Sequence, residues 1–267
     1  MKRNLALFLI VLFFLPSLAC GSFTTDTLIG SGDIVTQTID VSNFDRVTLE
    51  GFGSVFITQG QTESLSVQTD DNLISLLDIN VQGRELKLGV KRGFSITPSQ
   101  SITFNLTVQD LSAITLDGSG DFFVEPLQSD SFAVSIRGSG NIDIQGLTAE
   151  DLSVDLDGSG NISIQDIQVK AVETSLQGSG DIELEGKADD QKVTVGGSGN
   201  YLAEDLETDS ADISIPGSAD VTVWVSDALT VRVNGSGDLR FYGQPRIDQS
   251  GSGSGNITSL GDKYSLA

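Results

Sequence analysis

The chain has 267 residues, no histidine, one cysteine and a formal net charge of −22. The absence of histidine excludes Ser-His-Asp catalysis, a histidine general base and histidine-ligated metals. A single cysteine excludes an intrachain disulfide and a cysteine-rich zinc site. The large negative charge makes nucleic acid an unfavourable partner, because its phosphates would be repelled.

The first twenty residues have the pattern of an export signal. Lys2 and Arg3 precede an unbroken apolar run of 11 residues, at 5–15, which is too short to span a bilayer as a helix. Small residues then precede Cys20, as in a bacterial lipobox, where the cysteine is lipidated and becomes the new N-terminus. The sequence therefore predicts a signal peptide at 1–19, lipidation of Cys20 and a lipid-anchored linker at 20–33. An ordinary secretory signal cleaved nearby is the alternative, and both interpretations predict export.

Residues 35–115 alternate apolar and polar side chains without the strict repeat of the later chain. This pattern predicts strands, either in less regular coils or in a cap at one end. Within the segment, Arg84, Lys87, Lys91 and Arg92 form a basic group. One hypothesis is that this group contacts an anionic membrane near the anchor or an acidic partner. The alternative is a solvated run of charges.

From residue 118 onward, a Gly-Ser-Gly-Asp/Asn motif recurs at a nearly constant interval. The steps between successive motifs are 20, 20, 20, 19, 20, 18 and 18 residues. The motifs begin at Gly118, Gly138, Gly158, Gly178, Gly197, Gly217, Gly235 and Gly253. Self-similarity at a fixed period of this size indicates a repeat architecture.

The residues that flank each motif alternate with period two. Leu152, Val154 and Leu156 precede one motif, and Ile162 and Ile164 follow it. Such alternation predicts strands with one buried face, and no helical period is present in the return segments. The repeat therefore predicts an all-β solenoid with one coil of about 20 residues per repeat, in which coils stack about 4.8 Å apart.

Glycine suits these turns for two reasons: it reaches positive φ without a steric penalty, and it lets neighbouring coils approach closely. Ala219 replaces the second glycine of one motif, which predicts a turn that keeps its path in a conformation allowed to alanine. The last motif residue is always Asp or Asn, and stacking predicts a ladder of side-chain hydrogen bonds. The ladder comprises Asp121, Asn141, Asn161, Asp181, Asn200, Asp220, Asp238 and Asn256. We interpret the turns as scaffold rather than as a recognition site.

Several runs resemble a bacterial family named "putative auto-transporter adhesin, head GIN domain". G-N-I occurs at 140–142 and 160–162, and F-D-R-V at 44–47 is followed by V-F-I-T-Q-G at 55–60. The resemblance implies a right-handed parallel β-helix on an exported or lipid-anchored protein. The resemblance runs from about 34 to 240, and the repeats continue beyond it, so we expect a domain at 34–260 with regular coils at 117–257. The Gly/Ser-rich segment at 249–261 is either the last coil or a frayed cap.

For function, we expect a non-catalytic lipoprotein of the bacterial cell envelope that acts as an adhesin-like interaction module. Its partners would be the membrane, through the anchor, and an unidentified protein or polysaccharide, without a cofactor or metal. The exposed aromatic candidates for such recognition are Tyr201, Trp224, Tyr242 and Tyr264, and the alternative for Trp224 is core filling or edge packing. The alternative is a structural or signalling-associated envelope protein without an adhesive role.

Two further alternatives have weaker support. The turns share glycines and an acid with calcium-binding nonapeptide repeats, but those repeats recur every nine residues and these every twenty or so. A carboxylate pair could hydrolyse a polysaccharide without histidine, but no clustered constellation of acids is evident in the sequence.

Overall fold

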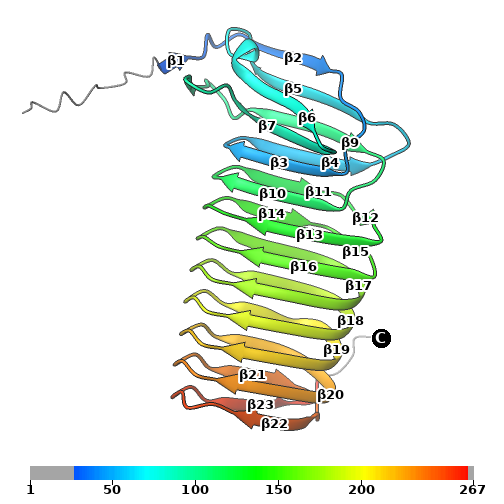
Figure 1. The fold of residues 1–267 in the computed structure, drawn as a ribbon, viewed down its shortest axis with the longest axis vertical. Helices are drawn as coiled ribbons and strands as arrows, with labels where there is room; N and C mark the ends of the chain where they lie inside the picture. The colour runs from blue at the N-terminus through cyan, green and yellow to red at the C-terminus, as the bar shows by residue number, and fades with distance from the viewer. Residues whose placement is uncertain (1–26, 264–267) are drawn as a thin grey trace, which may run out of the picture.

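The computed structural model describes residues 27–263, which form a β-solenoid with a less regular cap at its N-terminal end (Figure 1). This part of the chain contains no α-helix, and one short 3-10 helix, η1 (Ile74–Leu76), lies in the cap. The all-β class and the solenoid architecture predicted from the repeat are confirmed. The predicted signal peptide and Cys20 lie outside the described residues.

Each regular coil has three flat segments, and equivalent segments of successive coils pair in parallel. Face A is built from β3 (Arg46–Gly51), β10 (Ala113–Gly118), β13 (Ser131–Ile136), β16 (Asp151–Leu156), the last parts of β17 (Asn161–Leu176), β18 (Ile182–Val195), β19 (Tyr201–Ile215) and β20 (Val221–Val233), and β22 (Arg246–Ser250). Face B is built from β4 (Ser54–Gln59), β11 (Asp121–Val124), β14 (Asn141–Ile144), the first parts of β17 to β20, β21 (Leu239–Tyr242) and β23 (Ile257–Gly261). The short face C is built from β12 (Leu127–Gln128), β15 (Leu147–Thr148) and the middle parts of the four long strands. The Gly-Ser-Gly turns join face A to face B.

The register keeps identical positions in line from coil to coil. Phe122 pairs with Ile142, which pairs with Ile162, so the 20-residue step is preserved on face B. Where the step shortens, the register shifts between face B and face C, as between Ile164 and Ile167. The shorter repeats are therefore absorbed away from the Gly-Ser-Gly turns.

Alternation along each strand decides which side chains enter the core. Leu152, Val154 and Leu156 are buried, whereas Asp151 on the same strand is exposed. The inward residues of all coils form one continuous apolar core. Burying each large aliphatic side chain contributes about 1.5–3 kcal/mol, so the stack of coils rather than any single coil supplies the stability.

The cap is built by the chain that precedes β3 and by the chain between β4 and β10. Its strands are β1 (Thr27–Ile29), β2 (Ile34–Ile39), β5 (Ser64–Asp70), β6 (Leu77–Gln82), β7 (Glu85–Val90), β8 (Ser95–Thr97) and β9 (Thr103–Val108). β7 and β9 stack in parallel on β3 and β4. Beyond them the pairing becomes antiparallel: β5 joins β9, β2 joins β5, and β6 joins β7. The prediction of a less regular N-terminal portion is confirmed, and β1 lies inside the segment expected to be a linker.

The solenoid ends in a coil made of β22 and β23, so the Gly/Ser-rich segment forms the last coil rather than a frayed end. Two positions that are apolar in the preceding coil become polar here: Gln249 pairs with Val231, and Ser259 pairs with Phe241. Polar residues at core positions suit a coil whose outer edge faces solvent.

Candidate ligand-binding surfaces

The Gly-Ser-Gly turns are held closely against one another. A Cβ added at Gly160 would overlap the carbonyl oxygen of Gly140, and Gly180 meets Gly160 in the same way. Close approach of the coils is therefore one reason for glycine at these positions. The other expected reason, positive φ, is wrong for most of them: among the motif glycines within residues 27–263, only Gly118 has a positive φ.

Ala219 keeps the path of its turn, as predicted. Its φ is not positive, its side chain is buried, and the strands on either side continue the register from Tyr201 to Val221 to Leu239. One methyl group can therefore be accommodated at this turn without displacing a coil.

The Asp/Asn ladder forms the predicted hydrogen bonds. Asn141 Nδ2 donates to Asp121 Oδ1 at 2.9 Å, and Asn161 Nδ2 donates to Asn141 Oδ1 at 3.1 Å. The backbone N–H of Asp181 then donates to Asn161 Oδ1 at 3.0 Å. Because these groups are engaged with the neighbouring coil, the ladder acts as a brace along the solenoid.

Tyr201 was expected to be exposed, and this expectation is wrong. Its side chain is fully buried, its hydroxyl donates to Gln191 Oε1 at 3.2 Å, and Gln191 Nε2 donates to Thr208 Oγ1 at 2.8 Å. Thr208 Oγ1 continues the chain of hydrogen bonds to the carbonyl of Trp224. Burial raises the pKa of Tyr201, which keeps this hydroxyl neutral and fixed within the core.

Trp224 and Tyr242 are partly exposed, but the chain itself covers them. The Lys263 ammonium lies 5.4 Å from the Trp224 ring centroid and 5.3 Å from that of Tyr242, and it also pairs with Asp205. These contacts hold the C-terminal segment against the solenoid by cation–π attraction. Tyr264 lies outside the described residues.

The basic group is only partly available to a partner. Arg84 pairs with Asp45 at 2.9 Å, and Lys87 approaches Glu50 at 3.4 Å. The Asp45 carboxylate raises the pKa of Arg84 through a hydrogen bond and charge attraction. Lys91 Nζ donates to the carbonyl of Ser75, and the Arg92 side chain is exposed. Arg84 and Lys87 are therefore engaged within the cap, whereas Lys91 and Arg92 lie at the end of the cap.

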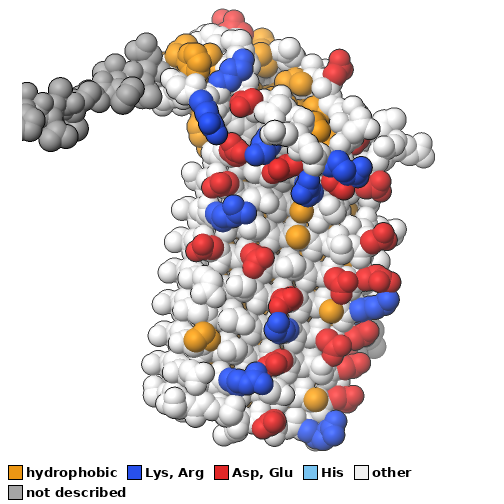
Figure 2. Space-filling view, in the orientation of Figure 1, with side chains coloured by type: hydrophobic (Ala, Val, Ile, Leu, Met, Phe, Trp, Pro, Cys, Tyr) orange, Lys and Arg blue, Asp and Glu red, His pale blue; other side chains and the backbone are white. Residues whose placement is uncertain are grey.

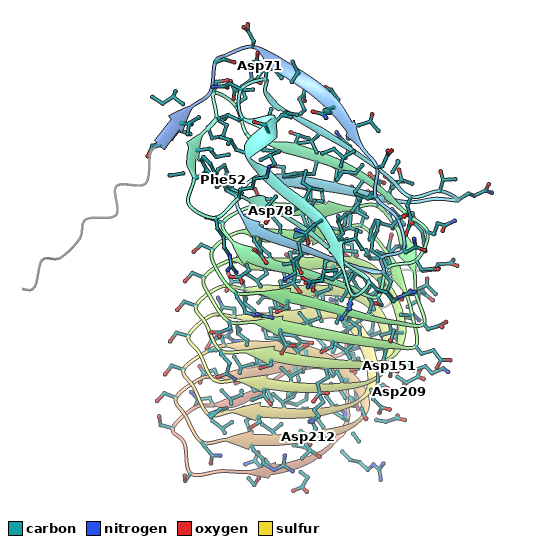
Figure 3. All side chains as sticks on the ribbon, turned by 45° about the horizontal axis from the view of Figure 1, so that its top comes forward. Phe52, Asp71, Asp78, Asp151, Asp209 and Asp212 are labelled. Carbon is teal, nitrogen blue, oxygen red and sulfur yellow. The ribbon has the colours of Figure 1, made fainter. Side chains whose placement is uncertain are left out.

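A shallow groove runs along face A across several coils and has a volume of about 650 Å³. Its lining side chains are mostly small, and they include Ser131, Ala133, Asp151, Ala171, Ser210 and Ala228. Most of its charged members have partners: Lys192 pairs with Glu173 at 2.7 Å, Arg232 pairs with Asp212 at 2.8 Å, and Ser210 Oγ donates to Asp190. Acidic and basic side chains alternate along this face in Figure 2, and Asp151 and Asp212 point away from the core in Figure 3.

A second hollow, of about 720 Å³, lies at the corner where face C meets face A near the cap. It is acidic, with Asp110, Asp130 and Glu150 in its lining, and Lys170 bonds Glu150 at 2.7 Å. Within residues 27–263, no group of three or more acidic, cysteine or histidine side chains is placed to hold a metal ion.

A third surface, which we name the neutral face, lies on the outer side of β2, β5, β9, β4 and β11. Phe56 on β4 and Phe123 on β11 are paired in register, 43% and 40% exposed, with ring centroids 5.0 Å apart and ring planes 16° from parallel. Phe56 borders a hollow of about 300 Å³. Apart from Phe56, the lining side chains that point outward are Thr38, Thr58, Ser64, Ser66, Asn105 and Thr107.

The sequence analysis missed Phe56 and Phe123, although a signal was present. Val55 and Ile57 are inward-facing, so the residue between them must face outward, and Phe123 occupies the matching position beside Phe122. A phenylalanine at an outward position of an alternating strand marks an exposed aromatic residue. The stacking of the two rings could not be inferred, because it depends on the register between segments 67 residues apart.

The geometry defines a rigid β-solenoid that presents regular, ion-paired faces along its length and a distinct neutral surface at its cap. The family "putative auto-transporter adhesin, head GIN domain" matches residues 43–165 and 147–245, and the chain belongs to this family. No curated protein matches the chain. Among residues 27–263, no helix has the length and apolar character needed to cross a membrane.

Solved structures from Parabacteroides and Bacteroides have the same fold. A protein from Parabacteroides distasonis described as a putative lipid binding protein is 29% identical, with a TM-score of 0.83 over 88% of this chain and 100% of that one. A putative adhesin from Parabacteroides merdae is 21% identical, with a TM-score of 0.83 over 88% of this chain and 99% of that one. A putative adhesin from Bacteroides fragilis is 24% identical, with a TM-score of 0.68 over 87% of this chain and 100% of that one.

Proposed function

We propose that the protein is a non-catalytic binding module of the bacterial cell envelope, tethered to a membrane by lipidation of Cys20. Membership of an adhesin-like family supports the role as an exported interaction module. The tethered arrangement rests on one observation: apolar and basic side chains are exposed on the cap where the described chain begins.

That end of the cap carries apolar side chains in contact with solvent. Ile29 is 73% exposed and Phe94 is 45% exposed. Both lie at the same edge of the cap, because Thr27 pairs with Ser95 and Ile29 pairs with Thr97. Phe52, 37% exposed, lies on the same side of the cap (Figure 3). Exposed apolar clusters of this kind mark contact with a membrane or a partner.

Two basic side chains accompany this apolar cluster. The backbone N–H of Phe94 donates to the carbonyl of Lys91 at 3.2 Å, so Lys91, Arg92 and Phe94 occupy one turn. Figure 2 shows basic side chains beside hydrophobic ones near the start of the described chain. Lysine and arginine near an anionic bilayer each add about 1 kcal/mol of attraction, and apolar side chains enter its interface.

The distance from the proposed anchor agrees with such contact. Cys20 lies seven residues before Thr27, and a fully extended chain spans at most about 25 Å over that length. The capped end would therefore stay close to the bilayer, and the coils would project away from it. The solved relative described as a putative lipid binding protein is in keeping with an interfacial contact of this kind.

The test is fractionation of cells that produce the full chain or the Cys20→Ala variant, with metabolic labelling by an alkyne fatty acid. We expect labelled, membrane-bound protein from the unaltered chain, and unlabelled, soluble protein from the variant. Ser22→Ala serves as the matched control and should behave like the unaltered chain. Equal membrane association of the Cys20→Ala variant, or no label on the unaltered chain, would contradict the proposal.

Labelling of intact cells distinguishes an interaction module that faces outward from a structural or signalling-associated envelope protein. Lys170 and Lys187 have highly exposed side chains, 66% and 68%, on the projecting coils. A membrane-impermeant amine reagent should modify them on intact cells if the module faces outward. Modification only after lysis would favour the alternative role.

A further inference from the structure

We propose that the neutral face of the cap binds an uncharged carbohydrate chain, with Phe56 and Phe123 as the platform on which a sugar ring stacks. The inference deepens the proposed function, because it names a ligand class for the binding module. It concerns a different surface from the membrane-facing end, on the side of the solenoid.

The first argument is the placement of the two rings. Phe56 and Phe123 stack on adjacent strands at outward positions, and neither contributes to the core. Their joint surface remains in contact with water, although exposed apolar surface of this kind is unfavourable unless a ligand covers it. The apolar C–H face of a sugar ring is flat and matches an aromatic surface.

The second argument is the supply of hydrogen-bonding groups beside the rings. The row that continues from Phe56 across the sheet is Asn105, Ser66 and Thr38, one residue on each successive strand. Thr58, Thr107 and Ser64 form the next row. Among residues 27–263, none of these six polar side chains makes a hydrogen bond to the protein. Hydroxyl and amide groups both donate and accept, as sugar hydroxyls do.

The third argument is the absence of charge from this hollow in a strongly acidic protein. The chain has 37 acidic and 15 basic residues, yet the lining of the hollow contains neither. Asp121, Glu125 and Asp143 flank Phe123 at the edge of the surface. A polyanionic glycan would be repelled by these carboxylates, whereas a neutral one would not.

The shape of the surface also favours a carbohydrate over a peptide or an acyl chain. β4, β9 and β5 are each paired on both sides, so the strands beside Phe56 offer no edge to which a peptide could add, and the free edge of β2 lies at the far end of the row. An acyl chain would bury these hydroxyl groups without satisfying their hydrogen bonds, which is unfavourable. Five strands at about 4.8 Å spacing give a platform about 19 Å wide, enough for more than one sugar ring.

The volume of the hollow is consistent with a weak, extended site. Its 300 Å³ lies at the lower end of the range of about 300–1,000 Å³ for ligand pockets. Only part of a polysaccharide would be held at one time, so affinity for a single chain should be modest. Many tethered copies on one cell would strengthen attachment by avidity.

The experiment is isothermal titration of the purified, non-lipidated protein with a panel of neutral glucan, mannan, galactan and xylan oligosaccharides. A sulfated and a carboxylated oligosaccharide are included for charge, and neutral phosphatidylcholine vesicles for apolar binding. We expect at least one neutral oligosaccharide to bind and the charged ones to bind at least about tenfold more weakly. Binding to none of the neutral oligosaccharides, or to the vesicles instead, would overturn the proposal.

The matched variants are Phe56→Ser with Phe123→Ser, Asn105→Ala, and Phe94→Ser as the control. Phe94 has a similar exposed fraction, 45%, but lies at the membrane-facing end. The double variant should lose at least about tenfold in affinity and Asn105→Ala about three- to tenfold, whereas Phe94→Ser should retain it. Circular dichroism melting checks that all variants fold. Unchanged affinity in a folded double variant would exclude the platform, whatever the result for Cys20.

Discussion

The regular coils and the cap are both built from strands with alternating inward and outward side chains, but the outward side chains differ in what they contact. In the coils, outward side chains bond to the next coil: Asn161 reaches Asn141, Lys192 reaches Glu173, and the turns approach so closely that only small residues fit. In the cap, antiparallel strands extend face B, and the outward side chains around Phe56 bond to nothing within the described chain. In the coils, outward polar side chains are engaged by the neighbouring coil. In the cap, the polar side chains around Phe56 are available to a ligand.

The difference also appears in what holds each region together. The coils depend on contacts repeated many times, so no single polar group is decisive. The cap depends on a few particular ones, and Asp70 is the clearest: its carboxylate accepts from the N–H of Gly32 at 2.8 Å, the N–H of Ser99 at 2.9 Å and the hydroxyl of Ser99 at 2.6 Å. Substitutions in the two regions should therefore differ in kind.

The largest effect is expected at a turn glycine of the coils. In Gly160→Val, the new side chain would overlap the backbone of Gly140, and the coils must separate. The free energy of unfolding should fall by about 3 kcal/mol or more, measured by urea denaturation. Ser159→Ala in the same turn is exposed and should change it by less than about 0.5 kcal/mol. Equal effects would show that close packing is not the reason for glycine.

Acid should act on the cap before the coils. The hydrogen bond from Ser99 holds the pKa of Asp70 below its ordinary value, so the charged carboxylate is favoured in the folded state. Its contribution is present above the ordinary pKa of about 4 and is lost as the pH falls through the lowered value. Amide protection factors, which correct for the slower intrinsic exchange at low pH, should fall first around Gly32 and Ser99 as the pH is lowered from 5. Asp70→Asn should show this loss of protection at pH 7, and a uniform loss in cap and coils would contradict the assignment.

Removing one hydroxyl from the core should have an intermediate effect. Tyr201→Phe leaves Gln191 Oε1 without its donor inside the solenoid. The expected cost is about 1–3 kcal/mol in the free energy of unfolding, because a buried acceptor stays unsatisfied. Thermal melting of Tyr201→Phe beside Tyr242→Phe, whose ring is at the surface, gives the comparison. A stability loss no larger than that of the surface variant would mean that the network contributes little.

The smallest effect is expected in the ladder. Asn161→Ala removes the bond to Asn141 and the acceptor for the N–H of Asp181. These groups are exposed and water replaces the lost partners, so the cost should be about 0.5–1.5 kcal/mol by urea denaturation. If Asn161→Ala lowered the free energy of unfolding as much as Gly160→Val, the ladder rather than turn packing would hold the coils together.

The sequence predicted the coils better than the cap, for a physical reason. In a repeat, the register between neighbouring strands can be read from the sequence, because residues such as Ile142 and Ile162 occupy equivalent positions in similar sequence contexts. The repeat therefore predicted the solenoid, the ladder and the turn at Ala219. Long-range pairing in the cap, such as β9 beside both β4 and β5, follows from no local pattern. For that reason the neutral face was missed. Tyr201, by contrast, lies in a regular coil, and its register with Ile182 and Val221 would have placed it in the core.

The most direct test of the division between scaffold and binding surface is hydrogen–deuterium exchange of the full chain with and without a saturating mixture of neutral oligosaccharides. The account predicts slower exchange in β4, β5 and β9, with no change in the face A strands that line the long groove. Protection confined to the groove, at 131–133 and 171–173, would place the binding surface on the repeats and contradict the account. Absence of protection throughout the chain would contradict it as well.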